Sequence, residues 1–161
     1  SYFHHWKLEK AEYLEKYLGF PVSHKKVDLI EIQSLDLYEI VEHKVREAYK
    51  IIQSPVLVED ASLEFEALGR LPEIYQIFPR RNVRRNDLLT SDGKEKHAIA
   101  KTVYGYFDGE KIEFFESQYP GIISEKPDEK MDMGGMDIYP EGYSQTRAEM
   151  NEKDHAKNYL E

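Results

Sequence analysis

Apolar residues recur at helical spacing near the start of the chain. Leu8, Ala11, Leu14 and Leu18 lie three or four positions apart, as the buried stripe of an amphipathic helix does. Gly19 follows the last of them, and glycine commonly stands just past a helix end because it tolerates a left-handed backbone. The pattern predicts a first helix that ends at Gly19.

A second apolar stripe predicts a helix from about residue 36 to residue 52. Asp36 and Glu39 have the spacing of a capping box, in which two side chains bond the free N–H groups of the first turn. The apolar positions are Ile40, Val41, Val45, Ala48 and Ile52. Lys44 lies on the same stripe, so its ammonium must either reach water or meet an anion.

If the anion is a phosphate, Lys44→Met is expected to preserve or raise the melting temperature of the ligand-free protein, because an apolar isostere avoids burying a charge.

Short apolar runs predict the strands. Residues 27–32 and 56–58 flank the second helix and complete a strand, helix, strand unit. Two long strands follow within residues 98–118, joined at Asp108 and Gly109, a dipeptide favoured in hairpin turns. A last helix is expected to begin near Thr146 and continue to the end of the chain. Together these elements predict an α/β fold with a mixed sheet.

Length and composition restrict the class of protein. The 161 residues predict one domain over positions 1–161, and 40% apolar with 33% charged residues is typical of a globular chain. The sequence lacks the roughly 20 consecutive apolar residues of a membrane span and an apolar signal region, so a cytoplasmic location without membrane contact is expected. Zero cysteines exclude disulfides and thiolate chemistry, and a net charge of −9 argues against nucleic acid as a partner.

Acidic residues follow the predicted strands at their ends. Glu59 and Asp60 come directly after residues 56–58, and Glu31 stands at the end of residues 27–32. Ligands of covered sheets gather beyond strand ends, so Glu31 and Asp60 could converge on one hard cation. Oxygen ligands of this kind suit magnesium or manganese bound to a phosphate substrate. The alternative is that these acids are solvated strand ends without a ligand.

Four segments resemble the inosine triphosphate pyrophosphatase family, in the family's order. They are residues 27–33, 44–48, 56–68 and 140–150. The family cleaves noncanonical purine nucleoside triphosphates to the monophosphate and pyrophosphate. The resemblance therefore implies a purine nucleoside triphosphate as ligand, a bent mixed central sheet whose two lobes flank a nucleotide cleft, and a homodimer.

The resemblance also implies catalytic roles. Glu31 and Asp60 match the family's metal-binding acids, which hold Mg²⁺ or Mn²⁺, and Asp60 with neighbouring Glu59 lies in the motif that activates water. Lys7 matches the lysine that follows the family's first strand and contacts phosphate, and it is counted with Asp60 and Glu59 among the catalytic residues.

Further positions match the family's substrate contacts. Lys44 matches a second phosphate-binding lysine, Asp137 the acid of a Phe-Gly-Trp-Asp motif, and Lys153 a lysine near the carboxyl terminus. Met136 stands beside Asp137 where the family has an aromatic ring. The resemblance thus implies a substrate site formed by Lys7, Lys44, Met136, Asp137 and Lys153.

Two functions remain open at this point. Retained acids and lysines favour a hydrolase of noncanonical purine nucleoside triphosphates. Residues 134–137 read Gly-Gly-Met-Asp, and the Ser-His-Arg triplet that the family carries near its end is missing. These departures favour a nucleotide-sensing subunit that turns over poorly and regulates a partner protein, for example in a defence or stress assembly. A structural domain without a ligand is the third reading.

Overall fold

The computed structural model describes residues 11–12, 14–16, 18–65, 71–72, 97–124, 138–147 and 149–150. Residues 11–12, 14–16 and 18 are helical, and Gly19 follows with φ +71° while its N–H donates to the carbonyl of Glu15. The predicted first helix and its glycine stop are therefore confirmed in this part of the chain. Among the described helices, none is long and apolar enough to span a membrane.

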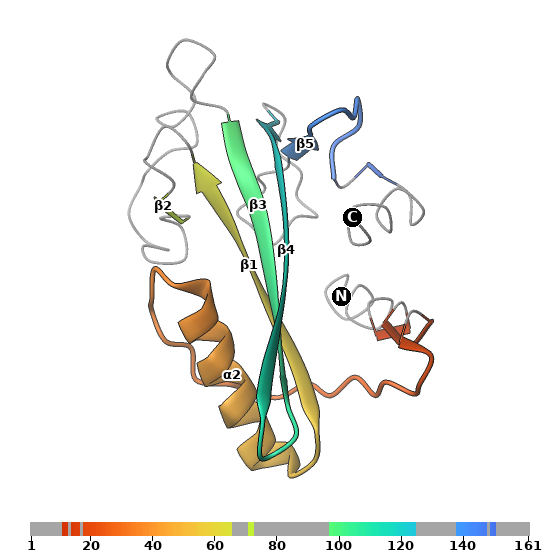
Figure 1. Cartoon of the computed structure of the whole chain (residues 1–161), viewed down its shortest axis with the longest axis vertical. Coiled ribbons are helices and arrows are strands. Elements are labelled where there is room, and N and C mark those ends of the chain that lie inside the picture. The colour runs from red at the N-terminus through yellow and green to blue at the C-terminus, as the bar shows by residue number, and fades with distance from the viewer. Residues whose placement is uncertain are drawn as a thin grey trace.

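Five described strands form one sheet in the order β2-β1-β3-β4-β5, and each neighbouring pair is antiparallel. Figure 1 shows β1, β3 and β4 as long strands that twist about one another, with β5 near one end. The bounds are Val56–Phe65 for β1, Leu71–Pro72 for β2, His97–Phe107 for β3, Ile112–Ile123 for β4 and Ile138–Pro140 for β5.

Helix α2 spans Leu37–Ile52, close to its predicted bounds. Asp36 caps it by accepting a hydrogen bond from the N–H of Tyr38. In the expected capping box, the Glu39 carboxylate would accept the N–H of Asp36. In the structure the Ser34 hydroxyl lies between them, because it accepts a hydrogen bond from the Asp36 N–H and donates one to the Glu39 carboxylate. The cap fixes where the first turn begins and thereby which helix residues face the sheet.

Helix α2 lies against one face of the sheet, here called the α2 face (Figure 1). Val41 is fully buried against this face, and a side chain on Gly105 of β3 would place its Cβ 2.6 Å from the Val41 Cγ1. Glycine at position 105 therefore lets the helix approach β3 closely. That close approach also brings the other residues of the same helix stripe, including Lys44, down onto the sheet.

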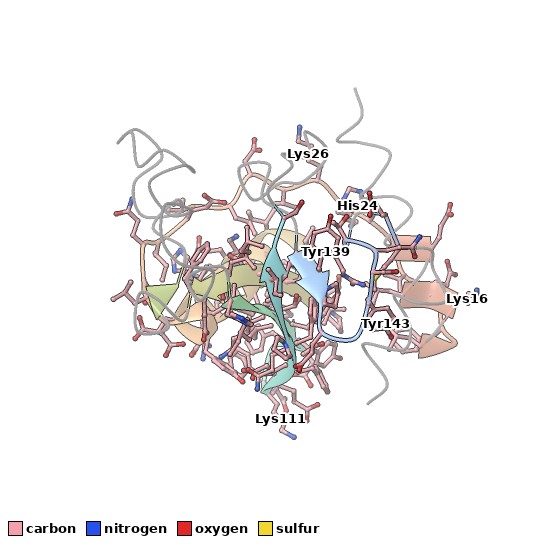
Figure 2. The ribbon with its side chains drawn as sticks, turned by 90° about the horizontal axis from the view of Figure 1, so that it is seen from above. Lys16, His24, Lys26, Lys111, Tyr139 and Tyr143 are labelled. Atoms are coloured by element: carbon pink, nitrogen blue, oxygen red, sulfur yellow. The ribbon has the colours of Figure 1, made fainter. Side chains whose placement is uncertain are left out.

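The hairpin between β3 and β4 closes where Asp108 and Gly109 predict it. The Asp108 carboxylate accepts hydrogen bonds from the N–H groups of Glu110 and Lys111, both at 2.8 Å, and these bonds lower the pKa of Asp108. Gly109 supplies the positive φ of +106° that the turn requires. The turn is longer than the two residues expected, and Lys111 projects outward from it (Figure 2).

Two apolar clusters cover opposite faces of the sheet. Leu37, Val41 and Val103 form one on the α2 face, whereas Leu63 and Ala100 belong to the other. Val103 and Ala100 lie three residues apart in the regular strand β3, so their side chains point to opposite sides. Each face of the sheet thus has an apolar core of its own, in agreement with the expected α/β fold class.

The predicted strand over residues 27–32 is wrong, because residues 21–34 have no assigned strand. Val27, Leu29 and Ile32 are half-buried, whereas Ile30 is 70% exposed. The alternation therefore indicated which side chains face the protein, but a strand also needs a partner for its backbone groups. Because residues 27–32 do not form a strand, the expected strand, helix, strand unit is absent among the described residues.

Two further boundaries differ from the prediction. Strand β1 does not end at Val58 but continues to Phe65, because its whole length pairs with β3. Glu59 and Asp60 consequently lie within a strand and not at its end. At the other boundary, the carbonyl of Thr146 accepts hydrogen bonds from the N–H groups of Glu149 and Met150, but the described residues 146–147 and 149–150 carry no assigned helix. The remainder of the predicted last helix lies outside the described residues.

Candidate active site

Lys44 and Asp60 meet on the α2 face. The Lys44 ammonium donates a hydrogen bond to Asp60 Oδ2 at 2.8 Å. Both side chains are largely removed from water, at 17% exposed for Lys44 and 13% for Asp60. The sequence predicts that Lys44 on an apolar stripe reaches water or an anion, and the anion here is the Asp60 carboxylate.

Glu31 approaches the same ammonium from the segment before α2. Its Oε1 lies 3.6 Å from Lys44 Nζ, and its side chain remains 78% exposed. Asp60 is held more firmly, because its Oδ1 also accepts the N–H of Ala61 at 2.9 Å. The structure thus brings together three of the predicted site residues, Glu31, Lys44 and Asp60, around one cationic nitrogen.

Glu59 is not part of this cluster. Adjacent residues of a strand point to opposite faces, and β1 pairs with β3 in unbroken register from Val56 to Phe65. Since Asp60 points to α2, Glu59 points to the other face, where its Oε2 is buried. Lys7, Met136, Asp137 and Lys153 lie outside the described residues.

A second charged cluster lies beside the first on the α2 face and was not predicted from the sequence. The Lys101 ammonium is 2.9 Å from Glu116 Oε2 and 5.3 Å from the centre of the Tyr38 ring. The Tyr38 hydroxyl donates to the same Glu116 oxygen at 2.7 Å. Ser62, two residues beyond Asp60, pairs with Lys101 across the strands. The period-two pattern of residues 97–107 and 112–123 was the signal that could have placed both charges on one face.

The second cluster shifts the titration of its members. The hydrogen bond from Lys101 lowers the pKa of Glu116 against the opposing effect of burial, and the bond to Glu116 raises the pKa of Tyr38. A carboxyl with a lowered pKa in the folded state adds stability above its ordinary value of 4.5, and this stability is lost as the pH falls through the folded-state pKa.

Glu116→Gln is therefore expected to destabilise the protein by up to about 1 kcal/mol at pH 7 and by less below pH 4. Urea unfolding of both proteins at the two pH values measures the difference. An equal difference at both pH values would show that the charge of Glu116 adds no stability beyond what the neutral glutamine side chain supplies.

The comparisons with known proteins agree with this fold. The chain matches the Ham1 family over residues 5–159. It is 31% identical over 154 residues to the dITP/XTP pyrophosphatase of Hyperthermus butylicus, which covers 94% of this chain and 81% of the relative. It is 37% identical over 138 residues to inosine triphosphate pyrophosphatase 2 of Trypanosoma cruzi, covering 83% and 70%. The chain belongs to the Ham1 family, and the resemblance seen in the sequence is confirmed.

Solved structures support the fold independently. The Staphylococcus aureus Ham1 protein aligns with a TM-score of 0.66 at 16% identity, over 94% of this chain and 89% of that chain. The nucleoside-triphosphatase, dITP/XTP pyrophosphatase, of Mycobacterium abscessus aligns with a TM-score of 0.64, also at 16% identity, over 92% and 87%. At this identity the likeness concerns the fold, and it confirms the predicted fold class.

Proposed function

We propose that this protein hydrolyses noncanonical purine nucleoside triphosphates of the ITP, dITP and XTP type to the monophosphate and pyrophosphate. The observation that carries the proposal is the Lys44 ammonium within reach of Asp60 and Glu31, in a chain of the Ham1 family. The relatives named above are pyrophosphatases of such nucleotides, which supports the substrate class.

The donor set at this site suits a hard divalent cation. Asp60 and Glu31 present carboxylate oxygens to one cationic centre, and magnesium prefers oxygen ligands while keeping several waters or substrate phosphates. Among the described residues, no group of three or more acidic, histidine or cysteine side chains could hold a metal ion by itself. Asp60 and Glu31 would therefore hold Mg²⁺ or Mn²⁺, with water and phosphate oxygens as the remaining ligands.

Each residue then has a separate task. A bound divalent ion polarises the phosphoryl oxygens and makes a bound water more acidic. Asp60 orients the attacking water, the largely exposed Glu31 adds a second carboxylate, and Lys44 neutralises the phosphate oxygens as negative charge develops on the leaving pyrophosphate. Lys7, Asp137 and Lys153 are assigned to substrate contacts by their match to the family pattern. Met136, beside Asp137, is assigned to contact with the purine base of the nucleotide.

A panel of ITP, XTP, dITP, ATP and GTP with Mg²⁺ tests the proposal. We expect pyrophosphate to be released from ITP, XTP and dITP at rates well above those of a metal-free control. Thermal stabilisation by the same nucleotides without any release would instead select the second candidate, a nucleotide-sensing subunit that regulates a partner protein. The observation that favours this second candidate is the replacement of the family's aromatic residues within positions 134–136.

Selectivity for the base is expected to be weak. Phosphate and metal contacts are the same for every nucleotide, so discrimination must come from hydrogen bonds and stacking on the base. The chain lacks the family's Ser-His-Arg triplet and has Met136 in place of an aromatic ring. We expect the dissociation constants of ITP and ATP, measured by calorimetry with Ca²⁺ in place of Mg²⁺, to differ by tenfold or less, about 1.4 kcal/mol. A hundredfold preference for ITP would contradict this.

We also propose a homodimer in solution, on the basis of the resemblance to the inosine triphosphate pyrophosphatase family. Light scattering coupled to size-exclusion chromatography measures the mass directly. A mass close to that of the 19.0 kDa chain at micromolar concentration would contradict the proposal.

A further inference from the structure

Lys44 occupies the position between the two acids that the proposed function assigns to the metal. Its Nζ lies 2.8 Å from Asp60 Oδ2 and 3.6 Å from Glu31 Oε1. We propose that the Lys44 ammonium takes the place of the divalent cation in the ligand-free protein, so that the site accepts its metal together with the triphosphate and not before it. This inference rests on the proposed function and adds an order of binding to it.

The three side chains differ in how firmly they are held. Asp60 lies within a paired strand and accepts a second hydrogen bond from Ala61, so its carboxylate has a fixed position. Glu31 comes from a segment without assigned strand and is 78% exposed, so its side chain has room to change its direction. Lys44 projects from the middle of a capped helix on a long side chain. The ammonium and the exposed acid can therefore move, while Asp60 stays.

A divalent ion and the ammonium cannot share the same two carboxylates. Like charges a few ångströms apart repel strongly wherever the side chains are largely shielded from water, as Lys44 and Asp60 are. The repulsion opposes metal binding for as long as Lys44 has no other anion to pair with. Free metal ions in solution should for this reason bind weakly to the ligand-free site.

A triphosphate removes this obstacle because its oxygens offer Lys44 a new anionic partner. When the ammonium turns to a phosphate oxygen, Asp60 Oδ2 and the Glu31 carboxylate become available to the cation that the nucleotide carries. Binding of the metal and of the triphosphate is then mutually favourable, and each ligand raises the affinity for the other by the same factor. In this arrangement Lys44 is a positioning residue as well as a phosphate contact.

The test is a titration of the nucleotide-free protein with Mn²⁺, followed by the paramagnetic signal of the free ion. Lys44→Met is expected to bind Mn²⁺ at least tenfold more tightly than the wild type, because the competing charge is gone. Lys101→Met is the matched control, since Lys101 is also a half-buried lysine on the α2 face, 2.9 Å from a carboxylate of Glu116. Its Mn²⁺ affinity is expected to stay within twofold of the wild type.

An unchanged or weaker Mn²⁺ affinity in Lys44→Met would overturn the inference, as would an equal gain in Lys101→Met. Lys44→Gln serves as a second variant if Lys44→Met does not fold, because its amide still donates a hydrogen bond to Asp60 without the charge. The titration needs neither nucleotide nor turnover. Failure of the nucleotide panel with a positive Mn²⁺ result would refute the hydrolase, and the reverse combination would refute the order of binding alone.

Discussion

Asp60→Asn is expected to reduce magnesium-dependent pyrophosphate release at least about a hundredfold while the protein stays folded. The substitution removes the negative charge that would hold the metal and orient the attacking water, and each tenfold loss of rate corresponds to about 1.4 kcal/mol of transition-state stabilisation. Asparagine has nearly the same shape, and its one amide oxygen still accepts one of the two hydrogen bonds that Ala61 and Lys44 donate to separate oxygens of Asp60, so the packing of β1 and α2 should survive.

A coupled colorimetric assay of pyrophosphate measures the rates, and circular dichroism confirms that the variant is folded. Glu113→Gln makes the same chemical change at a carboxylate of β4 that pairs with Lys111 near the hairpin. It is expected to keep wild-type activity. A folded Asp60→Asn protein with full activity would refute the catalytic assignment of Asp60 and with it the geometry proposed for the site.

The local signals of the sequence predicted the elements that carry the site. Asp36 and the apolar stripe located α2 to within a residue, because capping and periodicity act over a few neighbouring positions. Asp108 and Gly109 located the hairpin for the same reason. The stripe also placed Lys44 on the face that meets the sheet, but the spacing left open whether its ammonium reaches water or an anion, and the structure shows the anion to be Asp60.

Features that depend on pairing with residues far away in the chain could not be predicted from these local signals. Whether residues 27–32 join the sheet depends on a free strand edge beside them, and periodicity carries no information about that edge. Strand β1 extends beyond Val58 because β3 pairs with it over its whole length, and β3 is about 40 positions away in the chain. The separation of Glu59 from Asp60 follows from this extension, since a continued strand directs neighbouring side chains to opposite faces.

The contact between α2 and the sheet explains why the charges meet where they do. Glycine at position 105 lets Val41 approach β3, and this brings the next turn of the helix, with Lys44, over Asp60 of β1. On the other side of Val41 the same approach brings Tyr38 to Glu116 of β4. One closely packed helix therefore positions two charged clusters, of which the sequence pattern indicated the first alone.

Lys44→Met is expected to lower the stability of the ligand-free protein, the opposite of what the sequence alone suggested. An apolar isostere helps when a buried charge has no partner, but Lys44 pairs with an Asp60 side chain that is 13% exposed. Breaking a fully buried pair typically costs 3–5 kcal/mol, so a loss of about 2 kcal/mol is expected for this partly hydrated one. For a domain of this size that corresponds to a fall in melting temperature of about 4–8 °C.

Thermal unfolding without nucleotide or metal measures the effect, and two further variants define its cause. Lys50→Met removes a lysine of the same helix whose side chain is 70% exposed and pairs with Glu47, so its stability should change by less than about 0.5 kcal/mol. The double variant Lys44→Met with Asp60→Asn removes both charges and should recover part of the stability lost in Lys44→Met, because the uncompensated carboxylate is gone. A melting temperature of Lys44→Met equal to or above that of the wild type would show that desolvation of the two charges cancels their attraction, and that the pair is kept for ligand binding and not for stability.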